Sequence, residues 1–274
     1  MTQINLRGRG RPRKDANVRP VDNRPDHEVM KDLAFRFSML SRMSEAAARQ
    51  NIRSLVVSGA PGIGKTYSIE TALSDLNANY TSVAGALSGV ELYKLGYEHR
   101  APGSVIVLDD ADGIFKDEDA LNVLKALCDS SPVRKVSWLK DSATLRQDEV
   151  PQSYKFHGSF IFLTNIDMAF HAEANKNKYA PHFQALISRS LYLDLKLHSR
   201  QGIALWVNHI ATEGGMLESE GVPQNLQDRI LSFVQKERDN FRELSLRTVL
   251  KIIQLAKTNP AEWEMMARVL LCRA

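Results

Sequence analysis

The segment from residue 59 to residue 66 limits the possible folds of this chain more than any other. It reads Gly59, Ala60, Pro61, Gly62, Ile63, Gly64, Lys65, Thr66, which fits the pattern G-x-x-x-x-G-K followed by Ser or Thr. An apolar run, 54–58, precedes it and a helix-forming stretch follows. In that context the glycines let successive backbone N–H groups face phosphate oxygens, and the next helix adds its positive N-terminus. The segment predicts a phosphate-binding loop, with Lys65 on the β- and γ-phosphates and Thr66 on Mg²⁺.

Length and composition are those of a globular protein. The 274 residues are 43% hydrophobic and 25% charged, enough for one substantial core and a smaller second domain. The two cysteines, Cys128 and Cys272, lie far apart, which argues against a disulfide framework or a zinc site and favours a reducing compartment. No apolar run reaches the roughly 18 residues of a membrane span, and no signal peptide is recognisable. We expect a cytoplasmic protein without a membrane segment.

Pattern changes along the chain predict three parts. Residues 1–25 are rich in Arg, Gly, Pro, Asn and Asp and should form a flexible basic arm. Six basic residues against Asp15 within residues 1–20 give +5, so the rest of the chain, from a total of +4, carries −1. Residues 26–197 contain a helix and then apolar strand-like runs alternating with helices. Residues 198–274 contain only amphipathic helical patterns and should form a small all-helical lid domain.

The apolar runs predict the strands of a parallel sheet. They lie at 54–58, 80–83, 105–108 and 160–164, with a fifth at 190–195, and their continuous apolar character suits strands covered on both faces. Helical stretches between them indicate right-handed crossovers. The fold class predicted is α/β, a doubly wound parallel-sheet P-loop NTPase core with a helical C-terminal domain.

Two carboxylates end the third run, Val105 to Leu108. Asp109 should hold the Mg²⁺ shell at the sheet edge beside the phosphate loop. Asp110 should polarise the water that attacks the γ-phosphate, because hydrolysis of this kind depends on positioning that water. The other interpretation is that Asp110 caps the next turn.

Together these residues resemble the AAA+ ATPases over the chain from about residue 27 to its end. Asn165, after the run 160–164, matches the sensor 1 position that aligns the water. The segment 185–189 looks like the one carrying the arginine finger, so the resemblance implies that Arg189 reaches the γ-phosphate in a neighbouring subunit. The segment 245–248 resembles sensor 2, which implies that Arg247 touches the nucleotide from the lid. Ordinary ion-paired arginines and a turn-capping Asn165 are the alternatives.

The resemblance implies ATP and Mg²⁺ as cofactors, a nucleotide site of residues 59–66 with Tyr67 and Arg247, and a homo-oligomer, either a hexamer or an open ring. Most of the family has Glu where this chain has Asp110, a side chain one methylene shorter, so slow hydrolysis is expected. Guanine is disfavoured because residues 175–178, Asn-Lys-Asn-Lys, lack the final Asp of the guanine-reading motif. The compact chain also resembles small ATPases of tailed bacteriophages, which implies the host cytoplasm.

About thirty residues between Asp129 and Phe160 exceed a usual connection and predict two short strands near 134–138 and 150–156. This insertion resembles the hairpin before sensor 1 in one large AAA+ branch. Its basic residues either face nucleic acid or form a solvated surface; they are Arg134, Lys135, Lys140 and Arg146.

The N-terminal arm contains Arg9, Gly10, Arg11 and Pro12 among further basic residues and resembles an AT-hook. An extended arginine pair between glycines can enter the narrow, electronegative minor groove of A·T-rich duplex DNA. The alternative is a solubilising or generally polyanion-binding tail.

Three functions follow as hypotheses. The first is an ATP-hydrolysing motor or loader acting on DNA or on a replication assembly, with a replicative helicase as a possible partner. The second is a protein-remodelling ATPase in which Tyr93 grips polypeptide, although a single Tyr at helical spacing is more often packed in a core. The third is a DNA-binding scaffold switched by ATP with little turnover, which Asp110 favours.

Overall fold

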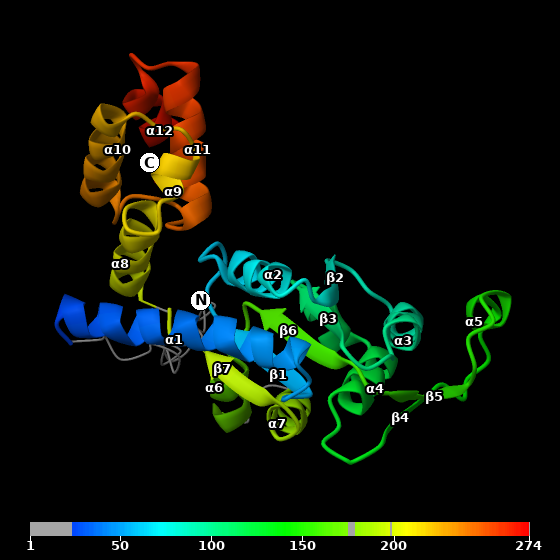
Figure 1. The fold of residues 1–274 in the computed structure, drawn as a ribbon. Helices are drawn as coiled ribbons and strands as arrows, with labels where there is room; N and C mark the ends of the chain where they lie inside the picture. Colours follow the sequence, from blue (N-terminus) through cyan, green and yellow to red (C-terminus); the bar gives the residue numbers. More distant parts are fainter. Residues whose placement is uncertain (1–23, 175–178, 198, 274) are drawn as a thin grey trace, which may run out of the picture.

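The computed structural model describes residues 24–174, 179–197 and 199–273. An α/β core and a group of C-terminal helices stand side by side, joined near the start of α8 (Figure 1). Arg9, Gly10, Arg11 and Pro12 of the predicted arm lie outside the described residues. Among those that are described, no helix is long and apolar enough to cross a membrane.

The core contains a five-stranded parallel sheet in the order β2-β3-β6-β1-β7. Its strands are β1 (Ser54–Ser58), β2 (Asn79–Ala84), β3 (Ser104–Asp109), β6 (Ser159–Thr164) and β7 (Leu191–Asp194). Each predicted strand is therefore present, within one or two residues at its ends. The order places β6 between β1 and β3, although β6 comes last of the three in the sequence.

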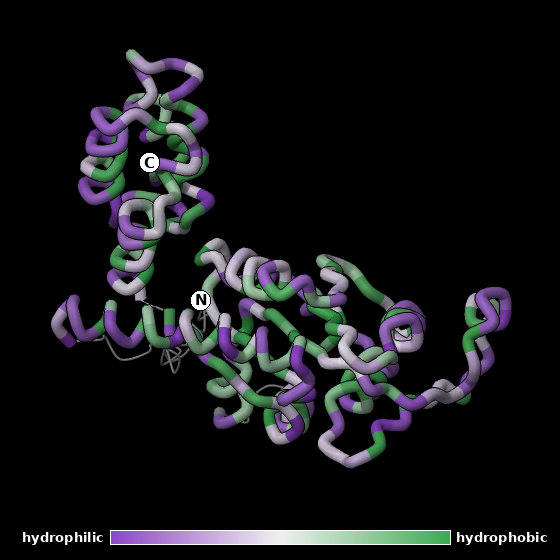
Figure 2. Tube along the Cα trace, in the orientation of Figure 1, coloured by the Kyte–Doolittle hydropathy of each residue, from purple (hydrophilic) through white to green (hydrophobic). Residues whose placement is uncertain are grey.

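Helices cover both faces of the sheet. Neighbouring residues of a buried strand point to opposite faces, so each such strand contributes side chains to both cores. Val105 and Val107 face the cluster made with α1 (Asp26–Ala48) and α2 (Lys65–Asp75), whereas Ile106 and Leu108 face the opposite cluster. That second cluster includes α3 (Gly89–Glu98), η1 (Asp112–Lys116), α4 (Glu118–Leu127), α6 (Met168–Ala174) and α7 (Ala180–Ile187). Figure 2 shows the hydrophobic residues running along the central strands.

The C-terminal helices have a core of their own. They are α8 (Arg200–Ala211), α9 (Met216–Ser219), α10 (Gln224–Glu237), α11 (Leu246–Thr258) and α12 (Trp263–Leu271), and their apolar faces meet around Trp263 and Phe233. These helices agree with the amphipathic helical patterns that the sequence shows in residues 198–274. A parallel α/β core followed by helices confirms the predicted fold class in its architecture, a parallel-sheet core with helices after it.

The predicted hairpin projects from the far end of the core (Figure 1). It consists of β4 (Arg134–Ser137) paired antiparallel with β5 (Ser153–Phe156), and the connection includes a short helix, α5 (Ala143–Gln147), that the sequence did not predict. The second strand begins later than predicted, because residues 148–152 lead from α5 into the strand.

Candidate functional site

The strand order brings three chain segments to one edge of the sheet. Ser58 at the end of β1 is paired with Thr164 at the end of β6, and Leu163 of β6 is paired with Asp109 at the end of β3. The phosphate-loop candidate follows β1, Asn165 follows β6 and Asp110 follows β3. Carboxyl ends of parallel strands are the usual place for ligand sites in open α/β sheets.

The loop 59–66 needs glycine at two positions. Gly62 has φ +67° and Gly64 has φ +94°, a left-handed conformation in which Gly64 stands at the N-cap of α2. Residues with a Cβ rarely adopt such angles, whereas glycine does so at little cost. The loop thus turns directly into the helix, so the free N–H groups of the first turn of α2 lie at the site, as anion binding requires.

Lys65 is the centre of the site's polar contacts. Its ammonium donates to the carbonyl oxygens of Gly59 (2.7 Å) and Ala60 (2.9 Å) and to Asn165 Oδ1 (2.7 Å). Burial lowers the pKa of Lys65 to about 8, an effect opposed by Asp109, Asp110 and Asp112 and strengthened by Arg247.

Thr66 and Asp109 lie close enough to share one cation. Thr66 Oγ1 donates to Asp109 Oδ2 at 2.5 Å. A hydroxyl and a carboxylate at this spacing fit Mg²⁺, which binds through one or two protein oxygens and completes its octahedron with water and phosphate. The described residues hold no group of three or more His, Cys, Asp or Glu suited to a metal.

Asp110 and Asn165 form the next contact of the network. Asn165 Nδ2 donates to Asp110 Oδ1 at 2.6 Å while its Oδ1 accepts from Lys65, so one amide joins the carboxylate to the ammonium. Asp110 has φ +51°, which costs on the order of 1 kcal/mol outside glycine.

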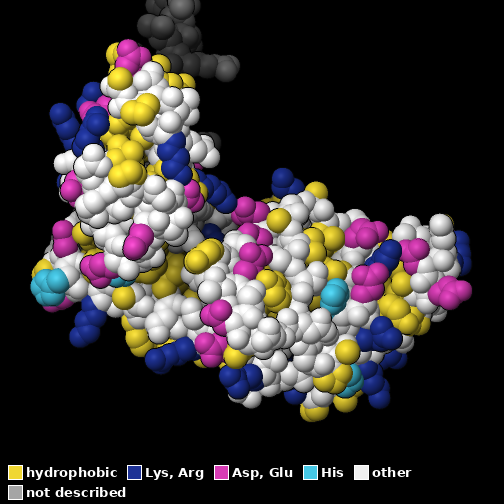
Figure 3. Space-filling view, turned by 45° about the horizontal axis from the view of Figure 1, so that its top comes forward, with side chains coloured by type: hydrophobic (Ala, Val, Ile, Leu, Met, Phe, Trp, Pro, Cys, Tyr) yellow, Lys and Arg dark blue, Asp and Glu magenta, His cyan; other side chains and the backbone are white. Residues whose placement is uncertain are grey.

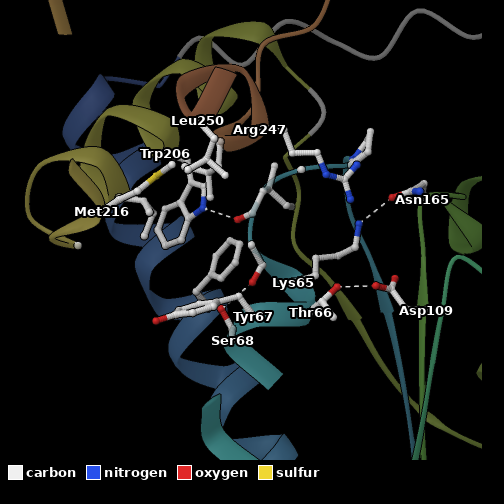
Figure 4. Close-up of a pocket in the computed structure, with 18 of the residues that line it drawn as sticks. Lys65, Thr66, Tyr67, Ser68, Asp109, Asn165, Trp206, Met216, Arg247 and Leu250 are labelled. Atoms are coloured by element: carbon white, nitrogen blue, oxygen red, sulfur yellow. Dashed lines mark hydrogen bonds between the residues drawn. The ribbon is translucent and has the colours of Figure 1, made fainter. Parts of the chain in front are cut away.

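The C-terminal helices contact the phosphate loop directly. The N–H of Leu246, in the first turn of α11, donates to the carbonyl of Gly62 (2.8 Å), and the indole N–H of Trp206 donates to that of Ile63 (3.0 Å). First-turn N–H groups have no partner within their helix, so this contact satisfies one of them. Arg247 follows immediately and lines the same cavity as Lys65 (Figure 4).

A cavity of about 480 Å³ extends from these groups between the core and the helices. Figure 3 shows the corresponding hollow, with hydrophobic side chains inside it. Its apolar end is formed by residues that the sequence did not single out: Phe37, Trp206, Ile210, Met216 and Leu250. Phe37 and Trp206 stack with ring centroids 3.9 Å apart, and Tyr67, 75% exposed, lies at the same end (Figure 4). In the sequence Phe37 and Trp206 look like ordinary core positions of helices, so no local signal marks them.

The contact of Gly62 with α11 gives a first prediction. A Cβ at Gly62 would lie 2.8 Å from Ser245 Cβ, and φ there is already left-handed. Gly62→Ala should lower the free energy of unfolding by about 2 kcal/mol through strain and overpacking. Urea denaturation measures this. Gly113→Ala is the control, because no heavy atom comes within 4 Å of a Cβ there; equal effects of both substitutions would contradict the contact.

Arg189 lies away from these groups. Its carbonyl accepts from Ser54 Oγ (3.2 Å), at the start of β1, whereas the phosphate loop follows the end of that strand. Its guanidinium donates to the carbonyl of Ala185 (2.8 Å) and lies 3.6 Å from Asp129. A strand of this length spans about 13 Å, so Arg189 cannot serve the nucleotide site of its own chain.

The hairpin's basic residues differ in what they contact. Arg134 is buried against Phe156 and donates to the carbonyls of Leu127 and Gly158, so for this residue both alternatives, facing nucleic acid and forming a solvated surface, are wrong. The side chain of Arg134 packs over the ring of Phe156, and burial lowers the pKa of Arg134 to about 10. Lys140 is paired with Asp119 and Arg146 with Asp141.

Comparisons place the chain beside one phage protein. It is 36% identical over 236 residues to the uncharacterized 36.7 kDa protein of the nrdC-mobD intergenic region of Enterobacteria phage T4, covering 85% of this chain and 72% of that protein. The predicted link to a bacteriophage is confirmed to that extent. No protein-family model matches the chain.

Among solved structures, the chain is similar to the Holliday junction branch migration motor RuvB of Thermotoga maritima. Identity is 12% and the TM-score 0.46, and the match covers 90% of this chain and 69% of that one. A variant of the same motor matches at 11% identity with a TM-score of 0.47. Proteins related this remotely do not share function as a rule, so branch migration remains a property of that motor.

Proposed function

We propose that this chain, which belongs to the same family as the phage T4 36.7 kDa protein, binds and hydrolyses ATP and acts on DNA or on a DNA-replication or helicase-loading assembly. The single observation that carries the proposal is the meeting of Lys65, Thr66, Asp109, Asp110 and Asn165 at one sheet edge, within one cavity.

Charge in the cavity supports a triphosphate as ligand. The ammonium of Lys65 and the guanidinium of Arg247 lie close enough for the arginine to lower the lysine's pKa. Two neighbouring cations repel each other, and a polyanion between them removes that cost. Arg247 comes from α11, whose first N–H is bonded to Gly62, so phosphate binding would also fix the helices against the loop.

In the proposed reaction each residue has one task. Lys65 and Arg247 bind the phosphates, and backbone N–H groups of the loop 59–66 surround them. Thr66 and Asp109 would hold Mg²⁺, which when bound offsets charge on the phosphate oxygens. Asp110 accepts a proton from the attacking water, and Asn165 holds Asp110 in place through its amide (2.6 Å). The apolar end of the cavity suits a nucleobase, for which we propose adenine.

We propose that Arg189 acts on the nucleotide of a neighbouring copy, which requires a homo-oligomer, either a hexamer or an open ring. Support comes from its place at the N-terminal edge of the sheet, opposite the phosphate loop. In a head-to-tail assembly, the sheet edge with Arg189 in one copy would face the sheet edge with Asp109 and Asp110 in the next copy.

Two features favour DNA as the substrate over an unfolded polypeptide. The AT-hook-like arm is one, through Arg9, Gly10, Arg11 and Pro12. The hairpin is the other, since Lys135 and Lys155 are exposed and paired directly across its strands. Tyr93 cannot grip a polypeptide, as the protein-remodelling alternative requires, because it is fully buried and donates to the carbonyl of Pro151.

A DNA-bound ATP switch with little turnover is the second candidate. It is favoured by Asp110, which is shorter than Glu and whose carboxylate is engaged by Asn165. Steady-state ATPase rates separate the candidates when measured alone, with A·T-rich duplex, with single strands and with unfolded protein. Stimulation by DNA supports the motor, and tight DNA and ATP binding without turnover supports the switch. Stimulation by unfolded protein alone contradicts both.

The paired lysines of the hairpin give a second prediction. Like charges opposite each other destabilise a strand pair, and no described carboxylate neutralises Lys135 or Lys155. Replacing both by Glu should weaken DNA binding about tenfold at low salt, reduce its salt dependence, and spare ATPase activity without DNA. Fluorescence anisotropy measures the binding. The control, Lys94→Glu with Lys140→Glu, alters lysines already paired with aspartates; an equal loss there would contradict the assignment.

A further inference from the structure

Asp112 is a carboxylate at the site for which the proposed reaction has no task. It begins η1, three residues after Asp109, but it does not cap that helix, since its N-cap is Ala111. Burial, as the largest effect, and the nearby Asp110 raise the pKa of Asp112 above its ordinary value. A partly buried carboxylate costs free energy of folding. A residue whose only role was to begin a helical turn would not need to be a carboxylate.

The contacts of Asp112 all lead to the end of β6. Its Oδ1 accepts from Thr164 Oγ1 at 2.6 Å, and the backbone N–H of Asn165 is near enough to lower the pKa of this carboxyl. Thr164 Oγ1 in turn accepts from the N–H of Ile166 (3.0 Å). The hydroxyl of Thr164 thus links the carboxylate of Asp112 to the backbone of Ile166, and the two bonds enclose Asn165.

Asn165 can bridge Lys65 and Asp110 only if its backbone is held. Both contacts of its side-chain amide are short, at 2.7 Å to Lys65 and 2.6 Å to Asp110. These contacts hold only the end of the side chain and do not restrain the backbone of Asn165. The strand hydrogen bonds of β6 end at Thr164, one residue earlier. Beyond the strand, Ser58 Oγ of β1 donates to the carbonyl of Ile166 (2.8 Å), and Asp112 adds a second restraint from the loop after β3.

We propose that Asp112 is a positioning residue for hydrolysis, acting through Asn165 on the geometry of Asp110. This rests on the proposed ATPase function. Nucleotide binding depends on Lys65, Arg247 and the loop amides. Asp112 hydrogen-bonds none of them, and its charge raises the pKa of Lys65 less than the charges of Asp109 and Asp110 do. Loss of Asp112 should therefore affect the chemical step and leave ATP affinity intact.

The test compares kcat with ATP affinity in the full chain. Asp112→Ala should lower kcat about 10-fold to 100-fold, the range typical of supporting residues, with the Kd for MgATP within about threefold. Asp112→Asn keeps one acceptor oxygen and should recover part of the activity. Asp148→Ala, which removes an exposed carboxylate paired with Lys94, is the control. An unchanged kcat in folded Asp112→Ala, or a kcat loss matched by weaker ATP binding, overturns the proposal.

Two further measurements keep the outcome decisive. Thr164→Val removes one donor to Asp112 and should lower kcat in the same way, less than additively with Asp112→Ala, so it replaces that variant if the protein fails to fold. The side-chain amide resonance of Asn165, assigned by its loss in Asn165→Ser, reports the same contact without turnover. If the wild-type protein does not hydrolyse ATP, the ATPase proposal fails, but the contact between Asp112 and the Asn165 segment can still be tested. In that case an unchanged Asn165 amide resonance in Asp112→Ala overturns the positioning role.

Discussion

Lys65→Ala should reduce the affinity for MgATP at least about 100-fold, which corresponds to about 2.7 kcal/mol, and should abolish turnover. In the structure this ammonium lies within 2.9 Å of two loop carbonyls and within 2.7 Å of Asn165. Phosphate oxygens entering the cavity would exchange with these partners, and an ammonium beside a triphosphate in a half-enclosed site gives a strong charge-assisted bond. Alanine provides neither the charge nor the reach.

Isothermal titration with MgATP measures this loss. Lys94→Ala is the control, because that lysine pairs with Asp148 on the surface. The variant should still fold: burial already lowers the pKa of Lys65, so its removal relieves a desolvation cost and the melting temperature should change little. Unaltered MgATP affinity in folded Lys65→Ala would remove the basis of the nucleotide site.

Arg189→Ala should lower kcat about 1000-fold with ATP binding unchanged, because an arginine finger is worth about 10³-fold or more in phosphoryl transfer. Its carbonyl is bonded to Ser54 at the start of β1, so it cannot reach the phosphate loop of its own chain. Its side chain is 35% exposed, with Asp129 at 3.6 Å, which leaves it able to contact a neighbouring copy.

Mixing separates action in trans from a structural role. A mixture of Arg189→Ala with Lys65→Ala should regain part of the activity, since some interfaces combine an intact Arg189 with an intact nucleotide site. Arg229→Ala is the control, as that exposed arginine pairs with Glu264 on the C-terminal helices. Full activity of Arg189→Ala, or a mixture no more active than its components, would contradict the proposal.

The sequence predicts well wherever the signal is local. Apolar runs located β1, β3 and β6 because strands buried on both faces contain few polar residues, whereas the edge strands β2 and β7 are partly exposed. The pattern of 59–66 located the loop, since Gly62 and Gly64 occupy backbone conformations open mainly to glycine. Arg134 was misjudged because a basic residue in a short strand looks solvated, whereas here Phe156 and two carbonyls surround it.

The remaining features depend on strand order, which no local pattern specifies. Only the position of β6 between β1 and β3 sets Asn165 between Lys65 and Asp110, and brings Asp112 against Thr164. Likewise, Phe37 and Trp206 are 169 positions apart in the chain, and packing of α8 against α1 makes them one wall of the cavity. The sequence by itself determined which segments are strands, helices and phosphate loop, because backbone preference and hydrophobic period act over a few residues. Tertiary structure alone decided which side chains meet, because contacts between distant segments arise from the packing of whole elements.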